Sequence, residues 1–317
     1  MFGALYRLLI AESRLGRRLR HRRRFPGLGV HDFAELRVEG DFRYGAGASI
    51  GSWSVVQVPP GARLSLGNGA YLGRNVEVAP SGAIEIGDRT SIQDRSVFLG
   101  DVVIGRYCTI AYGAYGSSGN HRFDLDPAAL IKDQDALAAG ELRKRIVIED
   151  DCWIGNGVFV AAGVRIGKGS VVGANSVVTR DVPPYTIAAG APARALRQRL
   201  VFQPPGRIRH DRKEDLPYFY SGFRVADDER AQDRSLGGLV ATGAFALALD
   251  SARAKRVHVR IRSLSEIAQA LSLGGESRLL GQSFADADFP FPVDAASRLE
   301  FALSAPGPVC VEGAWVE

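Results

Sequence analysis

Aliphatic residues recur at every sixth position over much of the chain. The in-phase residues form two blocks: Ile86, Ile92, Phe98, Ile104 and Ile110, then Ile148, Ile154, Val160, Ile166, Val172 and Val178. A period of six fits neither a helix of 3.6 residues per turn nor the simple alternation of a half-buried strand. It fits a coil with three short faces in which every sixth side chain points inward. Residues 31–200 are therefore predicted to form a parallel β-helix in a mainly β protein.

Small residues follow the inward positions, as a tightly turning coil requires. The chain has 37 glycines, about 12% of its residues, against a usual share of about 7%. Several of them come directly after an in-phase aliphatic residue, among them Gly87, Gly105 and Gly155. A residue without Cβ lets the backbone turn each corner without a clash. The coil hypothesis thus accounts for the glycine excess.

Specific segments of this repeat resemble the bacterial hexapeptide-repeat acyltransferases of the sugar O-acetyltransferase type. The matching segments are Cys152-Trp153-Ile154-Gly155, Val171-Val172-Gly173-Ala174, Thr179-Arg180-Asp181-Val182-Pro183-Pro184 and Ala188-Ala189-Gly190-Ala191-Pro192-Ala193-Arg194. The resemblance covers about residues 40 to 197. It implies a left-handed β-helix, a homotrimer, acetyl-CoA as the acyl donor bound between subunits, and a saccharide acceptor.

The six-residue rhythm stops at about Ala111 and resumes at about Ile146, which predicts an inserted loop over residues 111–146. Loops of this length inside a compact repeat domain are usually functional. The loop contains His121, and an imidazole can take the proton from a sugar hydroxyl that attacks a thioester. His121 is therefore the predicted general base, and its placement resembles that of the catalytic histidine in sugar O-acetyltransferases.

Two polar neighbours of His121 are further candidates for the catalytic site. Asn120 and Asp124 are expected either to orient His121 or the sugar, or to cap their own backbone as turn residues. Upstream of Ile104 the resemblance is loose, so the sugar-binding residues of the family have no certain counterparts. Only suggestions can be made there, and they are Gln93, Asp94 and Asp101.

The resemblance also implies which residues bind coenzyme A. They are Trp153, Asn156, Ala174, Thr179, Arg180, Arg194 and Arg197. An indole offers a flat apolar wall, and guanidinium groups pair with nucleotide phosphates. The alternative for the indole is packing at a coil corner, and for the arginines it is solvation. No metal is expected, because His121 is the only histidine of the repeat region, whereas the zinc-binding γ-class carbonic anhydrases of this fold use three.

The two ends of the chain differ from the repeat. Residues 1–24 carry eight arginines and one acid, and residues 1–30 are predicted to form a basic amphipathic helix. This helix either contacts anionic lipid or caps the next domain. Nucleic acid is not an expected partner, since no aromatic residues alternate with the basic ones.

A second module is predicted after the repeat. Residues 201–234 are predicted to be a linker, and residues 235–317 a small β-rich domain. Its strand-like runs are 239–249, 257–261, 299–303 and 309–316. One helix is expected to interrupt them, over residues 264–273.

Cysteine usage and hydrophobicity bear on location. Three cysteines without a C-x-x-C pair suit a reducing compartment, and no segment has the length of apolar residues that a membrane span needs. The protein is therefore expected in the cytoplasm. Residues 1–24 are the segment through which it would contact the inner face of the bacterial inner membrane. Two alternatives to O-acetyl transfer stay open: N-acetylation of a nucleotide-linked amino sugar, and a non-catalytic β-helix that binds glycans or acts as a scaffold.

Overall fold

The computed structural model describes residues 20–21, 23–137, 144–225, 227–292 and 298–317. The chain forms two compact units, Met1–Val201 and Phe202–Glu317. Most of the basic helix predicted for residues 1–30 lies outside the described residues. Within the described ranges, no helix is both long enough and apolar enough to cross a membrane.

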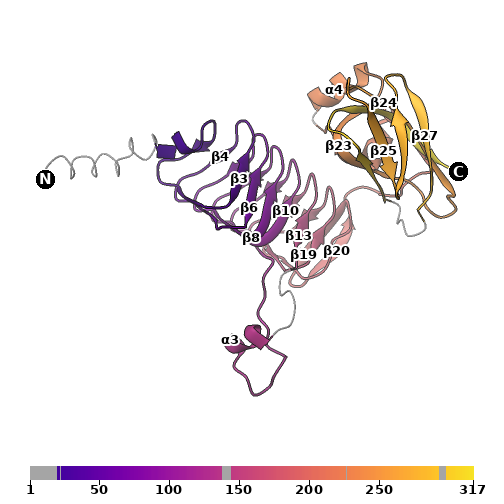
Figure 1. Ribbon diagram of the computed structural model, residues 1–317. Helices are drawn as coiled ribbons and strands as arrows, with labels where there is room; N and C mark the ends of the chain where they lie inside the picture. Colours follow the sequence, from indigo (N-terminus) through magenta and orange to yellow (C-terminus); the bar gives the residue numbers. More distant parts are fainter. Residues whose placement is uncertain (1–19, 22, 138–143, 226, 293–297) are drawn as a thin grey trace. The chain divides into compact units, whose positions relative to one another are not determined.

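The first unit is a parallel β-helix with three faces (Figure 1). Face A contains β1 (Gly29–Val30), β4 (Ser49–Ile50), β7 (Tyr71–Leu72), β9 (Ser91–Ile92), β11 (Thr109–Ile110), β14 (Trp153–Ile154), β17 (Val171–Val172), β19 (Thr186–Gly190) and β20 (Ala193–Gln198). Face B contains β2 (Glu35–Val38), β5 (Val55–Val58), the first parts of β8 (Glu77–Ile86) and β10 (Val97–Ile104), β12 (Tyr115–Ser117), β15 (Phe159–Val160) and β18 (Val177–Val178). Face C contains β3 (Asp41–Tyr44), β6 (Arg63–Leu66), the second parts of β8 and β10, β13 (Ile146–Ile148) and β16 (Arg165–Ile166).

The residues of the six-residue pattern form the core of this β-helix. Ile92, Ile110 and Ile154 stack in register on face A and are completely buried. The other in-phase residues of both blocks are also buried, with at most 2% of their surface exposed. Burial of this aliphatic column supplies the main stabilising free energy of the unit. The predicted fold class, a β-helix with a C-terminal β-rich domain, is confirmed.

Three corners connect the faces of each coil. We call the turn from face A to face B corner 1, that from B to C corner 2, and that from C to A corner 3. In one coil they are residues 155–158, 161–164 and 167–170. A Cβ on Gly167 would lie 2.5 Å from the backbone nitrogen of Pro184 in the next coil, which explains the glycine there.

The inserted loop is shorter than the predicted range of residues 111–146. Strand β12 continues face B, and Gly116 takes the inward position beside Phe98. A Cβ on Gly116 would lie 3.1 Å from the Phe98 ring, which already fills this space. A glycine thus stands where the six-residue pattern requires an aliphatic residue. For this reason the sequence pattern assigned β12 to the loop instead of to face B. The loop itself covers residues 119–145, with α3 (Ile131–Gln134) and the 3-10 turn η1 (Asp135–Leu137).

The second unit is an antiparallel β-domain with its own buried core. Its strands are β21 (Arg207–Arg209), β22 (Phe219–Phe223), β23 (Leu239–Ala248), β24 (Arg256–Ser263), β25 (Gln269–Leu273), β26 (Glu276–Leu280), β27 (Ala285–Pro290), β28 (Arg298–Leu303) and β29 (Val309–Val316). A 3-10 helix, η2 (Lys213–Tyr218), and α4 (Asp227–Ser235) complete it. The four predicted strand runs correspond to β23, β24, β28 and β29.

Two sequence predictions for this unit are wrong. The predicted linker over residues 201–234 contains β21 and β22, which pair with β29 and β23 of the domain. The predicted helix over residues 264–273 is instead a bend followed by β25. In β25 the side chains of Gln269, Leu271 and Leu273 are buried alternately, and pairing with β26 and β28 decides for the strand.

Candidate functional site

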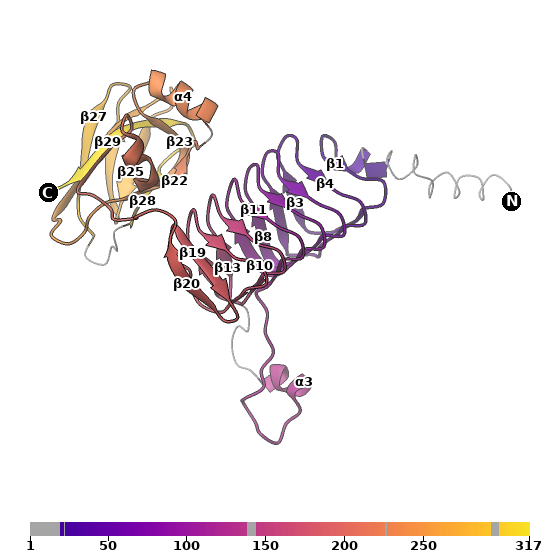
Figure 2. The same ribbon diagram turned by 180° about the vertical axis from the view of Figure 1, so that it is seen from behind.

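The loop of residues 119–145 leaves the β-helix at corner 2 and returns to the same corner. At its base the Lys144 N–H donates to the Ser118 carbonyl oxygen at 3.0 Å, and the Lys144 carbonyl accepts from Gly163 N–H at 2.9 Å. The first bond holds the two ends of the loop together, and the second joins the returning end to the next coil. Figures 1 and 2 show the loop projecting from the β-helix with α3 on it.

His121 is held by a carboxylate from the far part of this loop. Its Nδ1 lies 2.7 Å from Oδ2 of Asp135, and the other carboxylate oxygen accepts the backbone N–H of Arg122 at 2.8 Å. Because a carboxylate accepts the proton on Nδ1, the neutral ring keeps its lone pair on Nε2. This is the tautomer that a general base requires.

The same contacts keep the carboxylate charged. The hydrogen bond from Arg122 N–H, and after it that from His121, lower the pKa of Asp135 below its ordinary 3.8. Asp135 is therefore ionised at neutral pH. Because an ionised carboxylate is a stronger acceptor than a neutral one, it fixes the imidazole and stabilises the imidazolium that forms when Nε2 takes a proton.

Gln134 organises the loop around this pair. Its side chain is buried, and its Oε1 accepts the Leu125 N–H at 2.9 Å while its Nε2 donates to the Ala129 carbonyl at 3.2 Å. These two bonds tie the segment after His121 to the helical turn that carries Asp135. They account for two residues fourteen positions apart in the chain meeting at one point.

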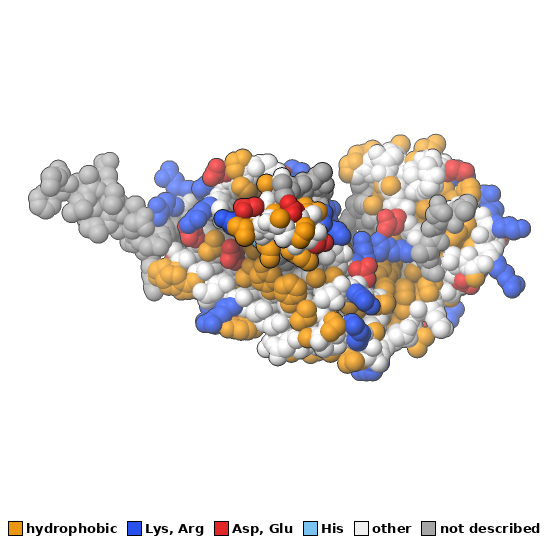
Figure 3. Space-filling view, turned by 90° about the horizontal axis from the view of Figure 1, so that it is seen from below, with side chains coloured by type: hydrophobic (Ala, Val, Ile, Leu, Met, Phe, Trp, Pro, Cys, Tyr) orange, Lys and Arg blue, Asp and Glu red, His pale blue; other side chains and the backbone are white. Residues whose placement is uncertain are grey.

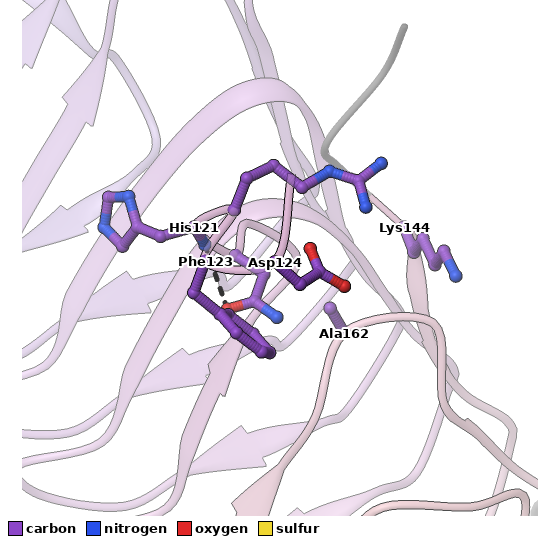
Figure 4. Close-up of a pocket in the computed structure, with 7 residues that line it drawn as sticks. His121, Phe123, Asp124, Lys144 and Ala162 are labelled. Carbon is purple, nitrogen blue, oxygen red and sulfur yellow. Dashed lines mark hydrogen bonds between the residues drawn. The ribbon is translucent and has the colours of Figure 1, made fainter. Parts of the chain in front are cut away.

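A pocket of about 290 Å³ lies beside His121. It is lined by the consecutive loop residues 120–124 together with Lys144 and Ala162 of corner 2. Figure 4 shows that the His121 ring points away from Lys144, whereas the Asp124 carboxylate lies on the Lys144 side. The pocket thus has the His121 imidazole on one side and the charged side chains of Asp124 and Lys144 on the other.

The two polar candidates next to His121 do not orient its ring. Asn120 accepts the backbone N–H of His121 at 2.9 Å, so it caps its own backbone as one alternative expected. Asp124 lines the pocket, while the ring is bound by Asp135. The ring-orienting role foreseen for Asn120 or Asp124 is therefore corrected to Asp135, and only contact with the sugar stays open for these two.

The residues implied for coenzyme A lie at several places on the β-helix. Trp153 is on the outer surface of face A with 56% of its surface exposed. Asn156 and Ala174 are exposed at corner 1 of successive coils. Thr179 and Arg180 are exposed at corner 2, the corner that carries the loop.

Arg194 and Arg197 lie on β20, at the last coil. Arg197 pairs with Ile187, which continues the outer row of Trp153 and Val171 on face A. Both guanidinium groups are bonded only to neighbouring backbone carbonyls within the described residues and are exposed. Trp153 and Arg197 therefore share the outer surface of face A. Thr179 and Arg180 lie instead at corner 2, on the far side of face B, where the loop also leaves the coil.

Two of the suggested sugar ligands have structural roles. Asp94 accepts the backbone N–H of Arg74 at 2.8 Å and its Nε at 2.9 Å, and the backbone bond is the main cause of a lowered Asp94 pKa. Asp101 accepts the Ala83 N–H at 2.8 Å. Each carboxylate fastens one coil to the preceding one. Gln93 is half-buried at corner 1, and face B separates this corner from corner 2, where the loop leaves the coil.

The cysteines are not suited to nucleophilic chemistry. Cys108, Cys152 and Cys310 are all buried. The hydrogen bond with Cys108, and then burial, raise the pKa of the Cys152 thiol well above its ordinary value, and burial raises that of Cys310 to about 11. Since the thiolate is the nucleophile, the Cys152 and Cys310 thiols are inert at neutral pH. In the described part of the chain, no three His, Cys, Asp or Glu side chains cluster as a metal site would need.

Comparison with known proteins agrees with this architecture. The sequence profile of the bacterial transferase hexapeptide family (six repeats) matches residues 83–115 and 145–180. A protein of Escherichia coli K12 named as a colanic acid biosynthesis acetyltransferase is 34% identical over 140 residues, which cover 42% of this chain and 71% of that protein. The chain belongs to the hexapeptide-repeat acetyltransferase family.

Other family members match over a smaller part of their length. A chloramphenicol acetyltransferase of Klebsiella aerogenes is 37% identical over 109 residues, 31% of this chain and 52% of that protein. The chain thus spans about half the length of several relatives that it matches. Among solved structures, a hexapeptide-repeat acetyltransferase of Vibrio cholerae is 35% identical, covering 43% of this chain and 73% of that one, with a TM-score of 0.36.

The hexapeptide family profile ends and resumes on either side of the loop, so repeat patterns say little about the loop itself. Sequence reasoning found His121 there but missed Asp135, Arg122 and Lys144. Asp135 is one of four aspartates in residues 124–135, and nothing in their spacing distinguishes it. A helical turn before residue 135 was the one signal that could have pointed to a folded loop.

Proposed function

We propose that this hexapeptide-repeat protein is an acetyl-CoA-dependent O-acetyltransferase that acts on a hydroxyl of a saccharide, such as a surface polysaccharide or its lipid-linked precursor. The observation that carries the proposal is the His121–Asp135 pair beside the pocket at the loop base. The Escherichia coli relative is named for colanic acid biosynthesis, which supports a saccharide acceptor.

The proposed reaction is a direct transfer. Nε2 of His121 takes the proton from the acceptor hydroxyl as its oxygen attacks the thioester carbonyl, and Asp135 stabilises the imidazolium. The carbon–sulfur bond then breaks, and the departing thiolate receives the proton from His121. Backbone N–H groups at the coil corners are the proposed donors to the tetrahedral oxyanion. The inert cysteines agree with a mechanism without an acyl-enzyme.

For the donor we propose the residues with an exposed position on the last coils. The Trp153 indole supplies an apolar wall, and Arg180, Arg194 and Arg197 supply charges for the phosphates of acetyl-CoA. Asn156, Ala174 and Thr179 present exposed corner positions to the rest of the coenzyme. All seven fit this role in chemistry and exposure.

We further propose that the active form is a homotrimer with the site between subunits. In one chain the His121 side chain is 78% exposed, and face B separates its loop from Asn156 and Ala174 at corner 1. A neighbouring subunit packed on face B would bring its corner 1 to this loop. Such packing would also exclude water around the base.

Apolar surface on face B and on the loop supports a trimer. The outer row Val97, Tyr115, Phe159 and Val177 runs across four paired strands, and the Tyr115 and Phe159 rings stack 5.5 Å apart. Among the described residues of the loop, four large hydrophobic side chains are exposed: Phe123, Leu125, Leu130 and Ile131. Figure 3 shows hydrophobic side chains at the end of the loop that faces the viewer. Exposed apolar rows of this kind mark interaction surfaces.

The proposed function is tested with purified protein, acetyl-CoA and a panel of saccharides. His121→Ala is expected to lower the turnover number by about 10²- to 10⁴-fold, the range for loss of a general base, with little change in affinity for CoA. Release of free thiol and mass spectrometry of the acceptor measure the reaction, and equilibrium titration measures CoA binding.

His31→Ala is the matched control, because His31 is an exposed histidine of the same unit but lies far from the loop. It should keep full activity. A loss of less than tenfold in His121→Ala would place the base elsewhere. Acetylation of an amino sugar without its hydroxyl counterpart would reject O-transfer, and CoA binding without transfer to any acceptor would favour a non-catalytic role.

A further inference from the structure

Two cationic side chains line this pocket, and Figure 4 shows Lys144 on the side away from the His121 ring. Arg122 lies next to His121 in the chain, and Lys144 closes the loop at corner 2; both line the pocket. Within the part of the chain that the structure describes, neither side chain has an ion pair within 4.0 Å. Asp124 is the one acidic residue in the lining, so the lining itself carries two positive charges and one negative charge. Outside the lining, Asp135 is bonded to His121 and to the Arg122 N–H, and the Arg122 charge also acts on it.

Arg122 also has an unfulfilled hydrogen-bond donor. Its Nε is buried and, in the described structure, has no acceptor. A buried donor without a partner costs about 1–3 kcal/mol, and more when the group is charged. A group of this kind in a native protein calls for an explanation, and a role in binding an ion is one. An anion that enters the pocket would accept from Arg122 and pair with Lys144.

The position of these charges relative to the base suits a substituent of the acceptor. In Figure 4, His121 and Lys144 lie on opposite sides of the pocket-lining residues. A group held at Lys144 is thus separated from the hydroxyl that would reach His121. Ala162, a small residue of corner 2, leaves room at the Lys144 end.

We propose that Arg122 and Lys144 form an anion subsite that selects an acceptor saccharide with a carboxylate or phosphate substituent. The proposal rests on the proposed function for its description of the ligand as an acceptor. The subsite orients the sugar so that one of its hydroxyls, and not the anionic group, faces His121. Neutral sugars lack this anchor and bind more weakly.

The test compares three probes with the same enzyme. They are a hexuronate oligosaccharide, its carboxyl-reduced neutral form, and a hexose 6-phosphate, which separates carboxylate from phosphate recognition. Acetyl transfer from acetyl-CoA gives kcat/KM, and saturation-transfer NMR measures binding independently of activity. We expect at least one anionic probe to exceed the neutral form by about 10- to 100-fold in kcat/KM, the range for a charged hydrogen bond.

Lys144→Met and Arg122→Gln should each remove most of this preference by raising KM for the anionic probe, with little effect on the neutral sugar. Lys132→Met is the matched control, because Lys132 is exposed on α3 of the same loop and does not line the pocket. Circular dichroism checks that each variant is folded. The second variant keeps the test valid if one of them misfolds.

The outcomes separate this inference from the proposed function. Transfer without a preference for the anionic probes, or an equal loss on all sugars in both variants, would overturn the anion subsite and leave the transferase proposal intact. Binding of an anionic probe that depends on Lys144 without any transfer would uphold the subsite and reject the transferase. If the anionic probes are neither bound nor acetylated, the subsite is rejected.

Discussion

A single carboxylate fixes the orientation of the His121 ring in the loop. Asp135 accepts from His121 Nδ1 and from the Arg122 N–H, so the ring and the backbone next to it are held by the same group. An exposed histidine without such a partner would rotate freely and present either nitrogen. On the proposed function, Asp135 is a positioning residue that acts through His121.

Asp135→Asn tests this role. The variant keeps a possible acceptor but loses the negative charge, so kcat should fall by about 10- to 100-fold, the effect of losing an orienting partner. KM for acetyl-CoA should stay the same, since the donor residues lie on other coils. Steady-state kinetics on both substrates make the measurement.

Two further variants distinguish positioning from a purely structural effect. Asp135→Glu retains the charge and should recover part of the lost kcat. Asp133→Asn removes an exposed carboxylate of the same helical turn and should behave as wild type. If Asp135→Asn raises both KM values and lowers the melting temperature, Asp135 stabilises the loop and does not act on the histidine.

The coil is the element that sets all distances on the β-helix. Each coil contributes inward aliphatic residues and tight corners, and glycine at a corner lets the next coil approach closely. The approach is visible at Gly87, where a Cβ would lie 2.6 Å from the backbone nitrogen of Arg106. Because the neighbour is backbone, no side chain can rotate away to make room.

Gly87→Ala should therefore destabilise the first unit. Forcing a methyl group into a packed position costs about 1–3 kcal/mol of the free energy of unfolding, and chemical denaturation measures it. Gly119→Ala is the control, because the nearest atom to its Cβ would be 3.9 Å away. Equal stability of both variants would show that the corners do not need glycine.

At the scale of the whole molecule, function on this proposal requires more than one copy of the chain. The loop leaves at corner 2, whereas the donor residues Asn156 and Ala174 lie at corner 1, and the apolar row of face B lies between these two corners. The second unit is an antiparallel β-domain with a separate core.

Phe159→Asp should break the trimer. Phe159 is 40% exposed in the single chain, and a charge at the centre of the apolar row would be buried without a partner on assembly. Light scattering after size exclusion should show monomers, and activity should fall with the trimer fraction. Tyr71→Asp, which changes a 38% exposed aromatic residue on face A, should remain trimeric. A trimeric Phe159→Asp variant, or a monomeric wild type, would contradict assembly through face B.

Residues with a regular period were the ones that sequence reasoning placed correctly. The positions from Ile86 to Ile110 and from Ile148 to Val178 are all buried as predicted, because a six-residue period has only one compact solution. The six-residue pattern breaks at Gly116, because the large ring of Phe98 on the preceding coil already fills the inward space there. No local sequence pattern reveals this contact. In the second unit, β25 was taken for a helix, although β26 pairs with it in a hairpin that follows directly and only β28 lies further along the chain.

By itself, the sequence determined the β-helix, the glycines at its corners and the loop with His121. These follow from local periodicity and from the steric demands of a turning backbone. Only the tertiary structure decided which of the loop's carboxylates holds the histidine, and that Arg122 and Lys144 share a pocket with it. The reason is physical: an irregular loop has no period, so its contacts depend on how its ends and its helical turn fold back in space.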